Sequence, residues 1–294
     1  MNKKIPAFFG HHKCGSTWIM KVISQVCRHM GIQHDHYYSP KKWGYSKDRK
    51  NTLDKVIYDL NSDFIGYTGA DLRYIGDINK FCGVHIIRDP RDIVTSAYFS
   101  HLHSHSTSGW PELAKFRKEI GNMSKEEGFL LNIDFTSRLP VDGLDLDLFK
   151  SMEEWNYKTS NILEMKYEDI IINPYKSFIQ IFDHFGFTEH VNINVVNIIY
   201  HTLFDSMQKG LRFINLPIKN KKIPEWYIMY CVYSNDFSRL AKGRSQGQEN
   251  TKSHFRKGIS GDWKNHFNDN HKDYFKKHYN EILIKLGYEN DDKW

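Results

Sequence analysis

The chain has 294 residues, a formal net charge of +6, 26% charged residues and 40% hydrophobic residues. These values are typical of a globular protein and argue against a disordered, fibrous or membrane-spanning chain. The positive charge is spread along the sequence without a long block of Lys and Arg, which argues against nucleic acid as a partner and weakly favours an anionic ligand.

The cysteine pattern and the N-terminal residues bear on the compartment. Four cysteines are scattered, without C-x-x-C spacing or the companion histidines of a zinc site. We expect reduced thiols and a cytoplasmic protein. Residues 1–4 lead directly into an apolar run, so we expect neither a signal peptide nor a membrane anchor. The even composition predicts one domain over residues 1–294.

The first informative stretch predicts a strand, a phosphate-binding loop and a helix. The apolar run at 5–9 precedes a loop that begins at Gly10 and ends at Gly15, and apolar residues recur at helical spacing over 19–30. The start of that helix must lie next to Gly15. Its unpaired N–H groups and its dipole make a site for a phosphate or sulfate group.

The loop differs from the nucleotide P-loop G-x-x-x-x-G-K-[ST] at one decisive position. Ser16 stands where a kinase or NTPase has its lysine, and the cation is Lys13 instead. A kinase needs that lysine on the transferred phosphate, together with Mg²⁺. The loop therefore favours a different leaving group, and a P-loop kinase-like phosphotransferase remains an alternative.

Two further strands complete the predicted core of the fold. Residues 64–68 and 83–87 read as short buried strands, and Pro90 suits the first position of the next helix. Arg88 then lies at the carboxyl end of a strand, and Ser96 about two turns into the helix. A guanidinium group and a hydroxyl suit a phosphate monoester, although a local Asp could also pair with Arg88. We predict an α/β protein with a P-loop-like central parallel sheet flanked by helices.

The remaining segments carry less information about function. His101, His103 and His105 alternate in sequence, which on a helix places them on different faces, and we expect no metal site there. The acidic segment 141–154 reads as a solvated face, with a pocket for a cationic acceptor as the alternative. Residues 162–169 read as a strand with a Tyr-Glu-Asp end.

Residues 13–18, K-C-G-S-T-W, resemble the 5′-phosphosulfate loop P-K-S-G-T-T-W of sulfotransferases that use 3′-phosphoadenosine 5′-phosphosulfate (PAPS). His12 replaces the proline of that motif, and Cys14 its first serine. The segment 201–207, H-T-L-F-D-S-M, is similar to the family's H-T-S-F-K-E-M. Residues 256–264, R-K-G-I-S-G-D-W-K, match its R-K-G-x-x-G-D-W-K.

The resemblance implies transfer of a sulfuryl group from PAPS, leaving adenosine 3′,5′-bisphosphate (PAP), to a hydroxyl or amine of a small-molecule acceptor such as a natural product, without a metal. It implies ligands of the 5′-phosphosulfate at Lys13, Cys14, Gly15, Ser16, Thr17 and Trp18; of the 3′-phosphate at Arg88, Ser96, Arg256, Lys257 and Gly258; and of the adenine at Trp18, Tyr167, Thr202 and Phe204.

The resemblance does not identify a general base in this sequence. The family's histidine, in a K-T-H context, falls at about Thr68 here. Histidine titrates in the range needed to take a proton from an alcohol, and His11 in the loop is our first candidate for the catalytic group beside Lys13. His34, His36 and Asp71 remain alternatives. A PAP-binding protein without catalysis also stays open.

Two regional expectations follow from the resemblance. Residues 205–253 correspond to the part of the family that covers the cofactor and acceptor sites, so we predict a lid there, with 243–251 as its flexible part. The family's dimer motif K-x-x-x-T-V-x-x-x-E is not intact after Lys264, which leaves the oligomeric state open.

Overall fold

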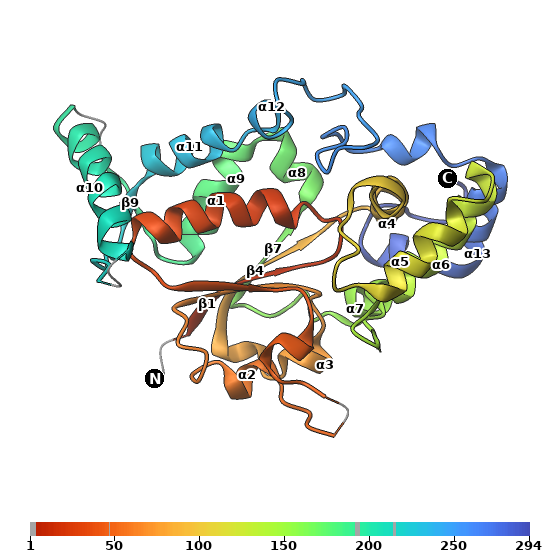
Figure 1. Cartoon of the computed structure of the whole chain (residues 1–294), viewed down its shortest axis with the longest axis horizontal. Coiled ribbons are helices and arrows are strands. Elements are labelled where there is room, and N and C mark those ends of the chain that lie inside the picture. Colours follow the sequence, from red (N-terminus) through yellow and green to blue (C-terminus); the bar gives the residue numbers. More distant parts are fainter. Residues whose placement is uncertain (1–3, 47, 192–194, 214–215) are drawn as a thin grey trace.

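The computed structural model describes residues 4–46, 48–191, 195–213 and 216–294. At its centre is a five-stranded parallel sheet with the strand order β2-β3-β1-β4-β7 (Figure 1). The strands are β1 (Ile5–Gly10), β2 (His34–Tyr37), β3 (Phe64–Thr68), β4 (Phe81–Ile87) and β7 (Ile162–Lys166). The predicted single α/β domain with a central parallel sheet is confirmed.

Helices cover both faces of the sheet because successive side chains of a strand point to opposite faces. Phe8 packs into a core with α1 (Ser16–His29), α9 (Pro174–His184) and α11 (Glu225–Ser234). Phe9 belongs to a second core on the other face. Helices that contribute to the second core are α2 (Leu53–Val56), α3 (Leu72–Ile75), α4 (Pro90–Phe99), α5 (Pro111–Ile120), α6 (Lys125–Arg138), α7 (Leu148–Glu154) and α13 (Asp269–Lys285).

The remaining elements are one long helix, α10, and several short helices and strands. They are α8 (Tyr167–Ile172), α10 (Val195–Phe213), α12 (Phe237–Leu240), the paired strands β5 (Pro140–Val141) with β6 (Leu144–Asp145) and β8 (Thr188–Glu189) with β9 (Ile223–Pro224), the 3-10 helices η1 (Pro40–Trp43), η2 (Ile78–Lys80) and η4 (Asp262–Asn265), and a π-helix at Ser100–Ser104. Of the helices in the described ranges, none has both the length and the apolar character needed to cross a bilayer.

Helix starts agree with the sequence signals. Pro90 is the first residue of α4, and the Asp89 side chain caps the helix by accepting from the Arg91 N–H. The side chain of Asn173 caps α9 in the same way, with Pro174 next in the chain. These positions are predictable because the capping groups lie within a few residues of the N–H groups that they satisfy.

One strand has no counterpart in the sequence analysis, and another ends earlier than expected. The strand without a counterpart is β2, which follows the first helix and pairs with β3 as the edge strand of the sheet. Its sequence, H-D-H-Y, is polar and half-buried and therefore lacks the apolar alternation of most strands. The strand predicted over 162–169 ends at Lys166, and Tyr167 begins α8 with two acidic residues in its first turn, where they interact favourably with the helix dipole.

Candidate active site

The loop at residues 11–15 follows the carboxyl end of β1, the edge at which sheets of this kind bind ligands. It enters α1 through two residues with positive φ, Lys13 at 63° and Gly15 at 78°. A positive φ is uncommon for a residue other than glycine and is found often at functional sites. The turn places Lys13 directly before the unpaired N–H groups of α1.

Arg88 joins this loop to the C-terminal part of the chain. It follows β4, and its Nη1 donates to the carbonyl of Lys13 at 3.0 Å while Nη2 donates to the carbonyl of Ile259 at 3.2 Å. The guanidinium lies 4.7 Å from the centre of the Tyr167 ring. Its Nε is buried and has no hydrogen-bond partner among the described residues. Arg88 therefore keeps a donor for a ligand, because buried polar groups are rarely left unpaired.

Two buried carboxylates hold the segment 256–263 against this site. Asp262 pairs with Arg256 at 2.6 Å and with Lys257 at 2.5 Å. Asp92, on α4, accepts from two backbone N–H groups of residues 261–263 at 2.6 and 3.0 Å. Buried ion pairs thus hold Arg256 and Lys257 in place.

A cavity of about 150 Å³, which we call the loop cavity, lies between these elements. Its lining comprises His12, Lys13, Gly15, Ser16, Thr17, Trp18, Tyr38, Thr68, Arg88, Ser96, His105, Tyr167, Phe237, His254, Phe255, Arg256, Lys257, Gly258 and Ile259. Four cationic side chains therefore converge on one small space next to a helix N-terminus, an arrangement that suits a highly charged anion.

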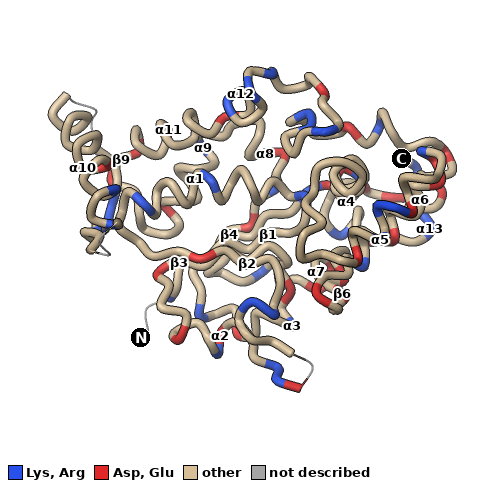
Figure 2. Tube along the Cα trace, in the orientation of Figure 1, with Lys and Arg blue, Asp and Glu red and all other residues tan. Residues whose placement is uncertain are grey.

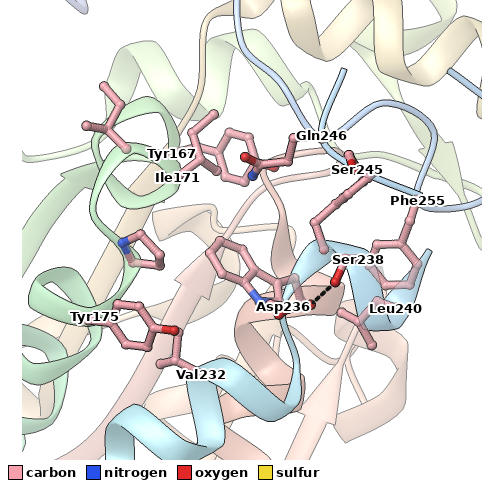
Figure 3. A pocket seen from close by; sticks show the side chains of 15 residues that line it. Tyr167, Ile171, Tyr175, Val232, Asp236, Ser238, Leu240, Ser245, Gln246 and Phe255 are labelled. Carbon is pink, nitrogen blue, oxygen red and sulfur yellow. Dashed lines mark hydrogen bonds between the residues drawn. The ribbon is translucent and has the colours of Figure 1, made fainter. Parts of the chain in front are cut away.

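A larger cavity of about 490 Å³, the aromatic cavity, adjoins the loop cavity and shares Trp18, Tyr167, Phe237 and Phe255 with it. In Figure 3, Tyr167 and Ile171 approach it from one side and Phe255, Leu240 and Ser238 from the other. Rings on two sides suit a flat heterocycle, because aromatic groups stack favourably on such faces.

A third cavity of about 320 Å³, the histidine cavity, adjoins the loop cavity on its other side. The two share His12, Thr17, Tyr38, Thr68, His105 and His254. Trp110, Leu139, Val141 and Leu146 supply apolar walls. The loop cavity therefore lies between a space that suits a base and a space that suits a small, partly apolar molecule.

The acidic segment 141–154 contributes apolar side chains to the histidine cavity. Figure 2 shows acidic residues gathered around β6 and α7. Val141 and Leu146 line the cavity, whereas Asp147 pairs with Arg73 at 2.9 Å. The interpretation of a solvated acidic face agrees with this arrangement better than a pocket for a cationic acceptor does.

The surroundings of Lys13 change its pKa. Burial, together with the nearby guanidinium groups of Arg88 and Arg256, lowers the pKa of Lys13 to about 7. The Lys13 ammonium makes no hydrogen bond or ion pair with any described residue. A bound anion would supply the missing partner and would favour the charged form of Lys13.

Most of the residues that the sequence assigned to the cofactor lie around the loop cavity. They are Lys13, Gly15, Ser16, Thr17, Trp18, Arg88, Ser96, Tyr167, Arg256, Lys257 and Gly258. Three of the assigned cofactor residues, Cys14, Thr202 and Phe204, and the proposed base His11 lie elsewhere. The Cys14 side chain is fully buried in the second core, and burial raises its pKa. It can contribute only through its backbone.

The assignment of His11 as the base does not fit its position. His11 is fully buried, and its Nε2 lies 2.8 Å from Nε2 of His85 on β4. His85 Nδ1 in turn lies 2.6 Å from Glu164. Because side chains two residues apart on a strand share a face, His11 continues the face of Phe9 into the core. His11 therefore lies away from the cavities, while His12 lines two of them.

The assignment of Thr202 and Phe204 to the adenine is not supported either. Both lie on α10, which Figure 1 shows beyond the C-terminal end of α1, at the opposite end of that helix from the loop. Phe204 packs with its ring centre 5.3 Å from that of His29. Thr202 is exposed, and its hydroxyl donates to the carbonyl of Ile198. Residues 201–207, which resemble the family's motif, belong to α10, a helix that packs against α1 away from the loop.

The other candidate bases occupy three different positions. His36 Nε2 lies 2.6 Å from the hydroxyl of Thr68, and burial followed by the proximity of His34 lowers its pKa to about 4. His34 lies at the start of β2, next to the carbonyl of Ile32. Asp71 caps α3 and is paired with Arg73 at 2.6 Å. Of these three, His36 comes nearest to the site, through Thr68.

Part of the site was missed from the sequence. Phe237 and Phe255 line the loop and aromatic cavities, and His105 and His254 line the loop and histidine cavities. Three of the four lie at or just beyond the second half of the predicted lid at 205–253, whose first half forms α10 and α11 against α1. The signal available was the pairing of aromatic with basic residues after 236. That the segment acts as a lid remains a prediction.

Gly15→Ala is expected to destabilise the protein more than an ordinary glycine substitution. A Cβ at residue 15 would lie 2.4 Å from the Tyr167 ring, and φ is 78°. The positive φ costs about 1 kcal/mol and overpacking about 1–3 kcal/mol more. Gly186→Ala is the matched control, because φ is 71° and no atom lies within 4 Å. Equal urea-unfolding free energies for the two variants would contradict the close packing of Tyr167 on the loop.

The fold is that of solved sulfotransferase structures. The chain is similar to mouse sulfotransferase SULT7A1 complexed with PAP, at 16% identity and a TM-score of 0.55, over 96% of this chain and 85% of that one. It is also similar to retinol dehydratase complexed with retinol and PAP, at 14% identity and a TM-score of 0.53, over 96% and 82%. Retinol dehydratase with androsterone and the inactive cofactor PAP gives a TM-score of 0.52 at 14% identity, over 95% and 80%.

Sequence comparison is informative at the level of the family. A search among curated proteins finds no significant match. The family model of the sulfotransferase domain matches residues 79–287, which include Arg88, Ser96 and the segment 256–264 and begin after the loop at 11–15. The match spans well over half of the 294 residues. The chain therefore belongs to the sulfotransferase domain family.

Proposed function

We propose that this protein transfers a sulfuryl group from PAPS to a hydroxyl or amine of a small-molecule acceptor. The observation that carries the proposal is the convergence of Lys13, Arg88, Arg256 and Lys257 on a loop cavity that continues into an aromatic cavity. A nucleotide with phosphates at both its 5′ and 3′ positions presents anionic groups next to a flat base. The four cations of the loop cavity match the anionic groups, and the aromatic cavity matches the base.

The cavity residues fit PAPS in two respects. The buried Nε of Arg88 lacks a partner among the described residues, and the Lys13 ammonium has no counter-ion there. These are the cations that an anionic ligand would satisfy. On the aromatic side, Trp18, Tyr167 and Phe237 line a space of about 490 Å³ that suits a purine.

The roles of the residues follow from their positions. When bound, PAPS supplies an activated sulfuryl group attached to its 5′-phosphate. Ser16, Thr17 and the first N–H groups of α1 would hold that phosphate. Lys13 would stabilise the charge that develops on the bridging oxygen as the sulfuryl group leaves, the kind of electrostatic term that contributes most to many enzymes. Arg88, with Ser96, Arg256, Lys257 and the Gly258 N–H, would hold the 3′-phosphate.

The acceptor is proposed to bind in the histidine cavity. Its volume of about 320 Å³ and its mixture of apolar walls and imidazoles suit a small molecule that carries one reactive hydroxyl or amine. The structures with androsterone and with retinol show that small molecules bind to proteins of this fold. A natural product is one such acceptor class.

Thermal unfolding with PAP, ADP and ATP-Mg²⁺ tests the donor site. PAP is expected to raise the melting temperature, because a ligand at 100 times its Kd adds about 2.7 kcal/mol to stability. The rise should be lost in Arg88→Ala and reduced in Ser96→Ala, which removes only a hydroxyl. Arg73→Ala is the control, since Arg73 pairs with Asp71 and Asp147 outside the three cavities.

The alternatives predict other results. Stabilisation mainly by ATP-Mg²⁺ would indicate a kinase-like phosphotransferase and would overturn the proposal. PAP binding without any formation of sulfated product from PAPS, over a panel of phenols, alcohols and amines, would indicate a PAP-binding protein without catalysis. Repeating the transfer assay with EDTA tests the expectation that no metal takes part.

A further inference from the structure

A chain of three polar side chains begins at the half-buried His12 of the loop and runs into the core. His12 Nε2 lies 3.0 Å from His101 Nε2, and His101 Nδ1 lies 2.8 Å from Asn132 Oδ1. His101 and Asn132 are both fully buried. His101 stands in the π-helix that follows α4, and Asn132 on α6.

A backbone carbonyl determines which group donates and which accepts in each hydrogen bond of this chain. Asn132 Nδ2 donates to the carbonyl of Val94 at 3.0 Å, and a carbonyl can only accept. The amide oxygen of Asn132 therefore faces His101 and accepts from its Nδ1–H. Neutral His101 then has a lone pair on Nε2, so the hydrogen between the two imidazoles belongs to His12 Nε2.

The consequence is that Nδ1 of His12 carries a lone pair. That nitrogen makes no hydrogen bond with any described residue. His12 lines both the loop cavity and the histidine cavity, where the donor and the acceptor are proposed to meet. Thr68, at the position of the family's histidine, lines the same two cavities. Of the two ring nitrogens of His12, Nδ1 is therefore the one that can accept a proton.

The surroundings keep His12 neutral. Burial is the largest cause that lowers its pKa, followed by the proximity of His101, Lys13, His105 and His254. Burial also lowers the pKa of His101, to about 3, so the buried member of the pair keeps its lone pair at neutral pH.

We propose that His12 is the general base of this protein, with His101 and Asn132 as positioning residues. The inference rests on the proposed function. As the acceptor oxygen bonds to sulfur, its proton moves to His12 Nδ1, and the sulfur–oxygen bond to the 5′-phosphate breaks with its electron pair on the phosphate. The imidazolium keeps donating through Nε2 to His101. His12 replaces both the proline of the family loop and the histidine that is missing at Thr68.

The neighbouring histidines are less well prepared for this role. His254 is exposed, and its Nε2 lies 3.0 Å from the hydroxyl of Thr17. His105 is held through Nδ1 by the carbonyl of Ser106 in an exposed loop. Neither is oriented by a chain of buried groups. A base must be held in one tautomer and one orientation, which is what the buried partners of His12 provide.

The first test reads the tautomer and needs neither donor nor acceptor. Two-bond ¹H–¹⁵N correlation spectra of ¹⁵N-histidine-labelled protein distinguish protonated from unprotonated ring nitrogens. At pH 7.5, His12 is expected to be protonated on Nε2 and unprotonated on Nδ1. In His101→Phe, which keeps the aromatic packing, this preference should be lost. A proton on Nδ1 of His12 in the wild type would overturn the proposal, whatever the outcome with PAP.

The second test separates catalysis from binding. His12→Gln keeps an N–H donor but cannot act as a base, so turnover of PAPS with 2-naphthol or water as acceptor should fall by about 10²-fold or more. The shift in melting temperature caused by PAP should change little, and added imidazole should restore part of the turnover in His12→Ala. His103→Ala, an exposed histidine two residues from His101, is the control. Unchanged turnover in His12→Gln would count against His12 and not against the sulfotransferase assignment.

Discussion

Lys13→Met is expected to lower the turnover number by about 10²- to 10³-fold, the usual cost of removing one donor aimed at a developing negative charge. The Lys13 side chain lines the loop cavity and has no partner among the described residues, so its removal leaves no buried group unpaired. The stability of the folded protein should therefore change little. Steady-state transfer from PAPS, followed by mass detection of the sulfated acceptor, measures the effect.

Proton uptake on PAP binding provides a second measurement of the role of Lys13. Because the pKa of Lys13 in the free protein is about 7, most Lys13 side chains are neutral amines at pH 8. An anionic ligand favours the charged form, so PAP binding should take up a proton there, and affinity should fall as pH rises above 7. Calorimetry in two buffers of different ionisation enthalpy measures that uptake.

The controls isolate the charge at residue 13. Lys115→Met removes an exposed lysine on α5 and should leave turnover and proton uptake unchanged. Lys13→Arg keeps the positive charge but not the compact ammonium, and its turnover should lie between those of the wild type and Lys13→Met. Wild-type turnover in Lys13→Met would show that the leaving group is stabilised by the other cations.

The parts of the site that could be predicted are those specified by short-range patterns. Strand, loop and helix at 5–29 follow from an apolar run, two glycines and helical periodicity, and each signal lies next to the feature that it determines. Arg88 was placed correctly because β4 and the Pro90 helix start fix the end of the strand. The segment 256–264 combines several residues in a fixed spacing, which a short accidental match rarely reproduces.

The predictions that do not fit the structure concern the direction of one side chain, His11, and the position of one helix, α10, in the fold. His11 and His12 are adjacent, but one enters the core and the other lines two cavities, because strand alternation continues through His11 and the chain then turns at Lys13. Following the face of Phe9 would have assigned His11 to the interior. Thr202 and Phe204 were placed by a short resemblance, while packing against His29 fixes α10 at the far end of α1. No local pattern reports that contact.

The second large effect is expected from Asp262→Asn. Asp262 is 1% exposed and accepts from Arg256 and Lys257, from His266 at 3.2 Å and from Asn265 at 2.9 Å. Removing one partner of a buried charge network typically costs about 3–5 kcal/mol, because a remaining charge is left uncompensated. Here Arg256 keeps its ion pair with Glu249, whereas Lys257 loses its carboxylate. Urea unfolding at pH 7 measures the loss. Asp59→Asn, at an exposed aspartate, is the control.

The pH dependence of stability identifies the carboxylate as the cause. Burial alone would raise the pKa of Asp262, but the hydrogen bonds from His266, Lys257, Asn265 and Arg256 outweigh it and hold the pKa well below its usual range. A carboxyl group with a lowered pKa stabilises the fold above its unfolded-state value of about 4, and the contribution is lost as pH falls below that value. Wild-type stability should therefore begin to decline below about pH 5 and continue to decline at lower pH, and the decline should be shallower in Asp262→Asn. Parallel curves would mean that Asp262 acts through packing, and the positions of Arg256 and Lys257 would then depend on other contacts, such as the ion pair of Arg256 with Glu249.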